Sequence, residues 1–436
     1  MDAIDRLILT GGPGERRLAL LSGDAVLDLL IDRFTPRAGD LFLGRVLARP
    51  AGLSAAFVEI GDGQPGFLSQ SGKAREGDAL LVQVTAAARR HKGAALSARP
   101  TLPGRWLAYD PHRPGLTLAR RIEGEARDRL RGTLAPLLQD GEGAVARSTA
   151  PQASEEELAG ELADLRRRWT ALTRQAAGLK PPARLYAPAL IEGALAEFPA
   201  IRAVETDEPA LLAEARAVFP GARLVPRCWE ESGAADLLEQ CLERRVPLAG
   251  GGALTIDETE ALTVIDIDGG ARGPAEANRA ALPEIARQMR LRALAGHILI
   301  DVIPPCGKPQ MAELLKTLET LLAGDPTPTQ VIGATRLGLV ELTRERRRPT
   351  LAELFLADPG PARNARALGL EGLAAALRAA AHDPALSPLL TAAPEVIHWL
   401  HSRPDLLAET RSRLGRPLAL AAKDGMTGFT LTGTTK

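Results

Sequence analysis

Two short apolar segments, each carrying a carboxylate near its end, hold the residues of this chain that are best suited to chemistry. Segment 262–268 reads LTVIDID and contains Asp266 and Asp268, and segment 297–303 reads HILIDVI and contains Asp301. Both segments have the β-branched, aliphatic composition of buried strands. Because an unpaired carboxylate is costly in such a setting, we expect a partner group or a metal ion beside it.

The connection between the two segments predicts that their carboxylates meet. Residues 284–294 read EIARQMRLRAL, which is typical of a helix, and Gly296 is a residue type at which helices end. A strand, a helix and a strand of this length form a right-handed crossover between parallel neighbouring strands. Asp266, Asp268 and Asp301 are therefore expected near one edge of one sheet.

Hydrolysis of a phosphodiester is the reaction that such a site serves. In-line attack needs a hydroxide nucleophile near neutral pH, and it needs the negative charge on the pentacovalent phosphorus to be neutralised. A Mg²⁺ ion held by two or three carboxylates supplies both. Asp266 and Asp301 suit direct ligation, and Asp268 faces the same side of its strand as Asp266. A polar strand end that caps a turn explains any one of these residues equally well, but the pair on adjacent strands favours the site.

The composition is that of an ordinary multidomain globular protein. The chain has 436 residues, 45% hydrophobic and 25% charged, which predicts roughly two to four domains. Lys+Arg and Asp+Glu both number 54, so we expect no coating of polyanions by total charge, although a local basic groove stays open. The absence of a signal-like start, of an apolar run of ~18 residues and of paired cysteines predicts a cytoplasmic location without membrane contact.

The elements before the carboxylates predict two β-rich modules. Residues 4–34 read as a β-meander, in which residues 11–14 form a hairpin turn and not a phosphate loop, because no Lys-Ser or Lys-Thr follows. Residues 39–97 contain five short predicted strands with glycines at the corners, the signature of an OB-fold barrel.

Aromatic residues in the predicted barrel suggest a nucleic-acid surface. Phe57 and Phe67 lie on neighbouring predicted strands, and Lys92 precedes the next strand. Aromatic faces and a cation suit base stacking and phosphate contact. A place for both phenylalanines in the barrel core is the alternative.

Two groups of arginines offer further candidate sites. Arg120 and Arg147, the second followed by Ser148, could grip a terminal phosphate, although a solvated basic face is the alternative. The run 344–348, together with the arginines of 284–294, predicts either a basic rim near the carboxylates or a plain surface face.

Taken together and in this order along the chain, the segments described above resemble the catalytic half of the bacterial ribonuclease E and ribonuclease G family. So many ordered segments are far more specific than any single motif. The resemblance rests on GDLFLGRVLARPAGLSAAFVEIG with GFL, KGAALS, LARRIEG, VARSTA, GGALTIDETEALTVIDIDGG, EIARQMRLRALAGHILIDVI and RLGLVELTRERRRPTL.

The resemblance implies a multidomain α/β and α+β fold. It comprises a split RNase H-like subdomain (1–36 and 185–250), an inserted OB-fold RNA-binding barrel (37–100), a sensor region for the RNA 5′-monophosphate (101–184), a DNase I-like catalytic subdomain (251–350), a linker (351–363) and a small C-terminal αβ domain (364–436).

The resemblance also implies an activity, namely Mg²⁺-dependent endonucleolytic cleavage of single-stranded RNA to 5′-phosphate and 3′-hydroxyl ends, in RNA processing or decay. Asp266 and Asp301 match the magnesium-binding aspartates, one ion per site, and Asp268 stands where the family usually has Asn. The other matching positions are Phe57, Phe67 and Lys92 for single-stranded RNA and Arg120, Arg147, Ser148, Gly104 and Ala108 for the 5′-phosphate.

The chain departs from the family pattern in its zinc link and its loops. Residues 352–360 read AELFLADPG where a CPxCxGxG motif is usual, so no zinc is expected and a homodimer without that link stays open. Residues 302–305 read VIPP where a further acid is usual, and the loops after Phe67 and Gly270 are shorter. A catalytically inactive, single-stranded RNA-binding relative is therefore the alternative function.

Overall fold

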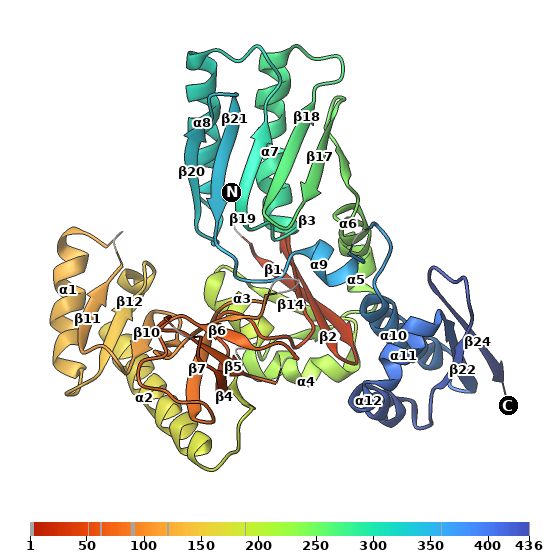
Figure 1. The fold of residues 1–436 in the computed structure, drawn as a ribbon, viewed down its shortest axis with the longest axis horizontal. Helices are drawn as coiled ribbons and strands as arrows, with labels where there is room; N and C mark the ends of the chain where they lie inside the picture. Colours follow the sequence, from red (N-terminus) through yellow and green to blue (C-terminus); the bar gives the residue numbers. More distant parts are fainter. Residues whose placement is uncertain are drawn as a thin grey trace. The chain divides into compact units, whose positions relative to one another are not determined.

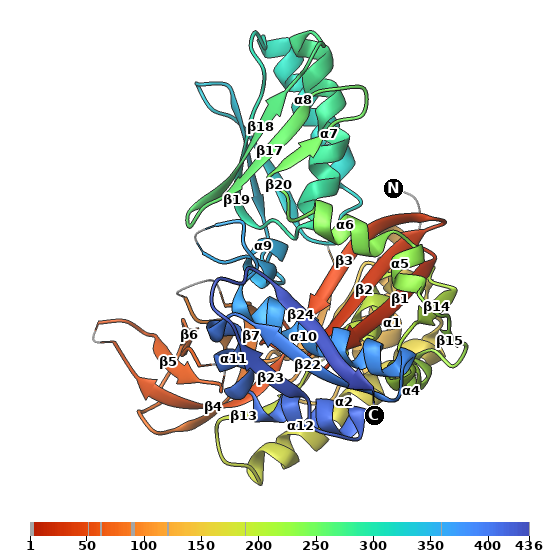
Figure 2. The same cartoon turned by 90° about the vertical axis from the view of Figure 1, so that its right-hand side faces the viewer.

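The computed structural model describes residues 4–50, 52–61, 63–88, 92–119, 122–187, 189–358 and 360–435. The chain divides into two compact units, the first formed by residues 1–34 with 200–436 and the second by residues 35–199 (Figure 1, Figure 2). No described helix is long and apolar enough to cross a membrane.

The second unit contains a closed five-stranded barrel. Its strands pair in the order β4-β5-β6-β8-β7, and β4 pairs again with β7, which closes the sheet. Phe42, Val58 and Leu96 are buried inside it. The five-stranded barrel predicted from the sequence is confirmed. Its strands are β4 (Leu41–Ala48), β5 (Ala56–Glu59), β6 (Gly66–Leu68), β7 (Ala79–Ala86) and β8 (Ala95–Ser97).

A four-stranded sheet follows the barrel in the same unit, in the order β11-β12-β10-β9. Helix α2 (Glu155–Ala177) packs on it and begins at a capping box, in which Ser154 and Glu157 satisfy each other's backbone N–H groups. The remaining elements are β9 (Leu102–Pro103), β10 (Leu107–Asp110), β11 (Gly115–Leu118), α1 (Gly124–Leu134), η1 (Ala135–Leu137), β12 (Gly143–Ala146), η2 (Ala150–Gln152), β13 (Ala183–Tyr186), which pairs with β4, and α3 (Leu190–Glu197).

The first unit begins with the predicted meander, whose strands β1 (Arg6–Gly12), β2 (Glu15–Ser22) and β3 (Ala25–Asp32) are antiparallel neighbours. Two strands from beyond the second unit extend this sheet to the order β15-β14-β1-β2-β3. The added elements are β14 (Ala203–Thr206), α4 (Pro209–Val218), β15 (Arg223–Leu224), α5 (Cys228–Glu231) and α6 (Ala234–Gln240).

A second sheet of the first unit carries the candidate carboxylates, with strand order β16-β17-β18-β19-β21-β20. Helices α7 (Pro274–Leu291) and α8 (Lys308–Leu322) pack against one face of it (Figure 1, Figure 2). Its strands are β16 (Arg245–Pro247), β17 (Ala253–Glu258), β18 (Leu262–Asp268), β19 (Gly296–Asp301), β20 (Thr329–Ala334) and β21 (Leu339–Arg344).

The predicted crossover is present, because β18 and β19 are parallel and α7 connects them. Helix α7 begins at Pro274, ten residues before the predicted start at 284. Pro283 lies inside the helix, and a proline is the residue at which a sequence-based prediction places a boundary.

The C-terminal part of the first unit is a three-stranded sheet in the order β23-β22-β24. The segment 351–363 is not an extended connection throughout, since it holds α9 (Leu351–Phe355), whose Phe355 is fully buried. The later elements are α10 (Ala365–His382), β22 (Leu386–Ala392), α11 (Pro394–His401), α12 (Pro404–Leu414), β23 (Ala419–Ala422) and β24 (Phe429–Thr435).

Three arginines of the expected basic rim, Arg290, Arg292 and Arg344, are buried instead. Arg290 is buried and its Nε donates to Asp28 Oδ2 at 3.0 Å, and Arg344 is buried with its Nη2 2.9 Å from Asp325 Oδ2. For these residues both interpretations, a rim and a plain surface, are wrong. The pair between Arg290 on α7 and Asp28 on β3 fastens the carboxylate-bearing sheet to the first sheet.

Candidate active site

Asp266 and Asp301 lie side by side on β18 and β19, where they are direct partners in the parallel register. Registered residues of neighbouring strands project from the same face, about 4.8 Å apart. Both side chains are exposed on the sheet face opposite α7 and α8, and within the described chain neither forms a hydrogen bond or an ion pair.

Asp268 reaches the same face but has partners. Its Oδ2 accepts from Arg245 Nη2 at 2.7 Å, and its Oδ1 accepts from the backbone N–H of Gly270 at 3.0 Å. The Gly270 N–H and, next, Arg245 hold the pKa of Asp268 below its usual range. The three predicted carboxylates thus share one face, with two of them open to solvent and the third engaged.

The two open carboxylates suit Mg²⁺ better than they suit a metal that needs a full protein cage. Over the described residues, no three His, Cys, Asp or Glu side chains come together in a way that could hold a metal ion. Mg²⁺ keeps several waters and is usually bound by one or two carboxylates together with substrate phosphates. The donor set Asp266 and Asp301 fits that pattern.

Asn278 on α7, a residue that we did not predict, fixes the chain just beyond Asp301. Its Nδ2 donates to the carbonyl of Ile303 and its Oδ1 accepts from the N–H of Ile303, both at 2.9 Å. The side chain is 1% exposed. The available signal was an amide on the apolar side of a helix, which is costly unless it is hydrogen-bonded.

The barrel presents an aromatic pair on its outside. Phe57 on β5 and Phe67 on β6 are direct cross-strand partners, with ring centroids 5.8 Å apart and an interplanar angle of 62°. Each is 39% exposed, whereas their neighbours Ala56 and Val58 are buried. The alternative of core residues is therefore wrong. Lys92, also exposed, lies three residues before β8, which pairs with β6.

The candidate phosphate pocket is partly assembled. Arg147 Nη1 donates to the carbonyl of Gly104 at 2.8 Å. Ala108 on β10 is close in the ladder, because the residue before it, Leu107, pairs with Ala146, the residue before Arg147. Ser148 is exposed beside Arg147. Arg120 lies outside the described residues. The structure thus joins Arg147 to Gly104, with Ala108 and Ser148 adjacent to them.

Glu161 on α2 shapes this loop and was not predicted. Its carboxylate accepts from the backbone N–H of Trp106 at 2.9 Å, from that of Leu107 at 2.8 Å, and from that of Arg105. A Cβ on Gly104 would come 2.6 Å from Glu161 Oε1. The close approach explains the glycine, and the carboxylate holds the segment that presents the Gly104 carbonyl to Arg147.

Comparisons with known proteins identify the family to which the sequence is similar. The sequence model of the Ribonuclease E/G family matches residues 101–347. Ribonuclease G of Escherichia coli (strain K12) is 31% identical over 399 residues, covering 80% of this chain and 81% of that protein. Ribonuclease G of Haemophilus influenzae is 30% identical over 412 residues, 83% of each protein.

Ribonuclease E of Nostoc sp. (strain PCC 7120) is 30% identical over 386 residues, covering 79% of this chain and 56% of that protein. The match to the family model and the identity and coverage of the ribonuclease G relatives lead to one conclusion. The chain belongs to the ribonuclease E/G family.

Proposed function

We propose that this protein is a Mg²⁺-dependent endoribonuclease that cleaves single-stranded RNA, in RNA processing or decay, and leaves 5′-phosphate and 3′-hydroxyl ends. Its membership of the ribonuclease E/G family supports an endoribonuclease. The observation that carries the chemistry is the open pair Asp266 and Asp301 on one sheet face.

Asp266 and Asp301 would hold the ion, which supplies an activated water and neutralises charge on the scissile phosphate. The parallel register of β18 and β19 orients the two carboxylates, and Asn278 holds the chain that leaves β19. Arg245 pairs with Asp268, which leaves Asp266 and Asp301 as the two of these three aspartates that are open to bind the ion.

Selection of single strands is assigned to Phe57 and Phe67. Their outward faces can stack only on bases that are not already paired, and such stacking contributes about 1–3 kcal/mol per base. Lys92 adds a cation for the RNA backbone. The barrel thus favours unpaired RNA without reading its sequence.

Arg147 is proposed to bind the 5′-monophosphate of the substrate. A guanidinium forms charge-assisted hydrogen bonds to phosphate, and the Gly104 carbonyl fixes its orientation. RNA with a 5′-monophosphate should be cut faster than RNA with a 5′-hydroxyl, and Arg147→Ala should remove this difference. If the unmodified protein shows no preference, the sensor role is excluded and the nuclease proposal stands.

A cleavage assay tests the central proposal. The full chain is incubated with an A/U-rich oligonucleotide in Mg²⁺ or in EDTA, and the product ends are mapped. We expect cleavage only with Mg²⁺, its loss in Asp301→Ala, and its retention in Glu313→Gln, which removes an exposed carboxylate on α8. Equal activity in Asp301→Ala defeats the assignment.

The second candidate function is single-stranded RNA binding without cleavage. It is favoured by two departures from the family pattern, namely the missing CPxCxGxG motif at residues 352–360 and the shorter loops after Phe67 and Gly270. Binding that weakens with salt and with Phe57→Ala, together with no cleavage at any Mg²⁺ concentration, would establish it.

A further inference from the structure

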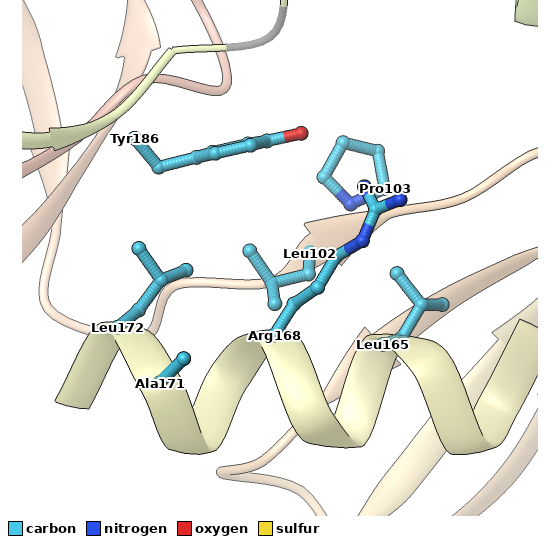
Figure 3. A pocket seen from close by; sticks show the side chains of 7 residues that line it. All are labelled: Leu102, Pro103, Leu165, Arg168, Ala171, Leu172 and Tyr186. Carbon is cyan, nitrogen blue, oxygen red and sulfur yellow. The ribbon is translucent and has the colours of Figure 1, made fainter. Parts of the chain in front are cut away.

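A pocket of about 210 Å³ lies in the second unit between helix α2 and strands β9 and β13. Figure 3 shows the ring of Tyr186 lying across the pocket from the helix, with Leu172 and Arg168 extending from the helix toward it. Leu102 and Pro103 on β9 form the third side. The walls are almost entirely apolar, apart from the phenol and the guanidinium.

We propose that this pocket binds the 5′-terminal nucleobase of an RNA whose 5′-phosphate is held at Arg147, an inference that rests on the proposed function. The ligand class is a flat, neutral heterocycle.

The shape and polarity of the pocket favour such a ring. The half-buried Tyr186 offers a conjugated face opposite the aliphatic Leu172, which makes a slot for a planar group. Arg168 is already paired, 2.6 Å from Asp164 Oδ2 and 3.5 Å from Glu192 Oε1. Its charge is therefore balanced, which disfavours an anion in the pocket.

The position of the pocket joins it to the candidate phosphate site. Pro103 lines the pocket, directly precedes Gly104, whose carbonyl accepts from Arg147, and pairs with Ala108. On α2, Leu165 of the pocket lies about one turn beyond Glu161, which holds the loop that contains Gly104. A terminal nucleotide could thus place its phosphate at Arg147 and its base in the pocket.

An exposed alanine provides a way to close the pocket. Ala171 lies at its edge on the surface of α2, so Ala171→Phe can fill the slot without disturbing buried residues. Thr170→Phe is the matched control, because Thr170 is exposed and lies on the opposite side of the helix, two residues from Arg168 and Leu172. Its hydroxyl donates to the backbone carbonyl of Arg166 in the same helix.

The test measures RNA binding in EDTA, so that it does not depend on cleavage. Fluorescence anisotropy compares a 5′-monophosphorylated single strand with the same strand carrying an abasic 5′-terminal ribose. We expect the abasic strand to bind the unmodified protein about 5- to 150-fold more weakly. This is the loss of affinity expected when the stacking of one base is removed. The difference should vanish in Ala171→Phe and persist in Thr170→Phe.

The outcomes separate this inference from the proposed function. If RNA binds but the abasic strand binds equally well, or if Ala171→Phe keeps the difference, the base pocket is wrong while the nuclease proposal stands. A pocket that seats a protein side chain instead would give this result. If the protein neither binds nor cleaves single-stranded RNA, both are overturned.

Discussion

Asp266 on β18 and Asp301 on β19 are registered partners in a parallel ladder, although 35 positions separate them in the sequence. Helix α7 connects these two parallel strands, and Asn278 on the same helix holds the chain beyond Asp301. The sheet face that they share is opposite the packed helices. Two negative charges therefore lie together where a phosphate group can reach them.

Replacing either aspartate should abolish cleavage while leaving the fold intact. For Asp301→Asn and Asp266→Asn we expect cleavage to fall by about 100-fold or more, since a carboxylate that binds the ion becomes a neutral amide. Both positions are exposed, so the free energy of unfolding should change by less than about 0.5 kcal/mol. Calorimetric Mg²⁺ titration gives an independent readout. Undiminished Mg²⁺ affinity in both variants would contradict the assignment.

Asp268 should matter less than its neighbours. Asp268→Asn keeps an oxygen for the Gly270 N–H and loses only the exposed pair with Arg245, so we expect cleavage to fall about tenfold or less. Arg245→Gln is the companion variant and should behave similarly. A loss as complete as that of Asp301→Asn would show that Asp268 binds the ion directly.

The outward aromatic pair predicts a binding defect without a folding defect. Phe57→Ala should weaken single-stranded RNA binding by about 1–3 kcal/mol, measured by anisotropy at several salt concentrations. Leu137→Ala is the control, since Leu137 has the same 39% exposure and lies on η1 outside the barrel. Equal affinities for the two variants would remove the stacking role.

The ion pairs of Asp28 should contribute strongly to stability. Asp28 is 4% exposed and accepts from Arg290 Nε at 3.0 Å and from Arg348 Nη2 at 2.7 Å. Asp28→Ala removes the buried carboxylate that both guanidinium groups share and should cost about 3–5 kcal/mol, seen as a lower urea midpoint. Asp24→Asn, a fully exposed position, should leave the midpoint unchanged. A small effect of Asp28→Ala would mean that water reaches the arginines.

Tyr109 predicts a stability loss in alkali. Burial, and then its hydrogen bond to Glu142, raise the pKa of Tyr109 to about 12. In the unfolded chain the tyrosine phenol has its ordinary pKa of about 10. The stabilisation that the protonated phenol gives the folded state is therefore complete below about pH 10 and is lost as the pH rises toward 12. In Tyr186→Phe, phenolate absorbance reports Tyr109 alone, because the chain has two tyrosines. Ionisation near pH 10 in the folded protein would contradict this prediction.

The parts of the fold that were predictable are those set by local patterns. Alternating apolar residues and corner glycines marked the barrel strands and the meander, and the two strands with a helix between them fixed the parallel pair. That crossover predicted Asp266 and Asp301 near one edge of the sheet, but not the register that makes them direct partners. The RNA and metal roles, the subdomain names and the dimer stay predictions.

Other features depended on partners far away in the sequence. Arg290 and Arg344 look like surface cations until Asp28 and Asp325 are placed beside them. Glu161 is an ordinary helix residue until the loop it holds folds against α2. Such contacts arise from tertiary packing, which no local pattern encodes.

The parallel pairing of β1 with β14 has a consequence for synthesis. Ile8 pairs with Glu205, and the entire second unit, residues 35–199, lies between them in the chain. At ordinary translation rates the ribosome needs roughly 10–30 s to make that insertion. During this interval the edge of β1 that later pairs with β14 lacks its partner strand, and an open strand edge of this kind can pair with another nascent chain.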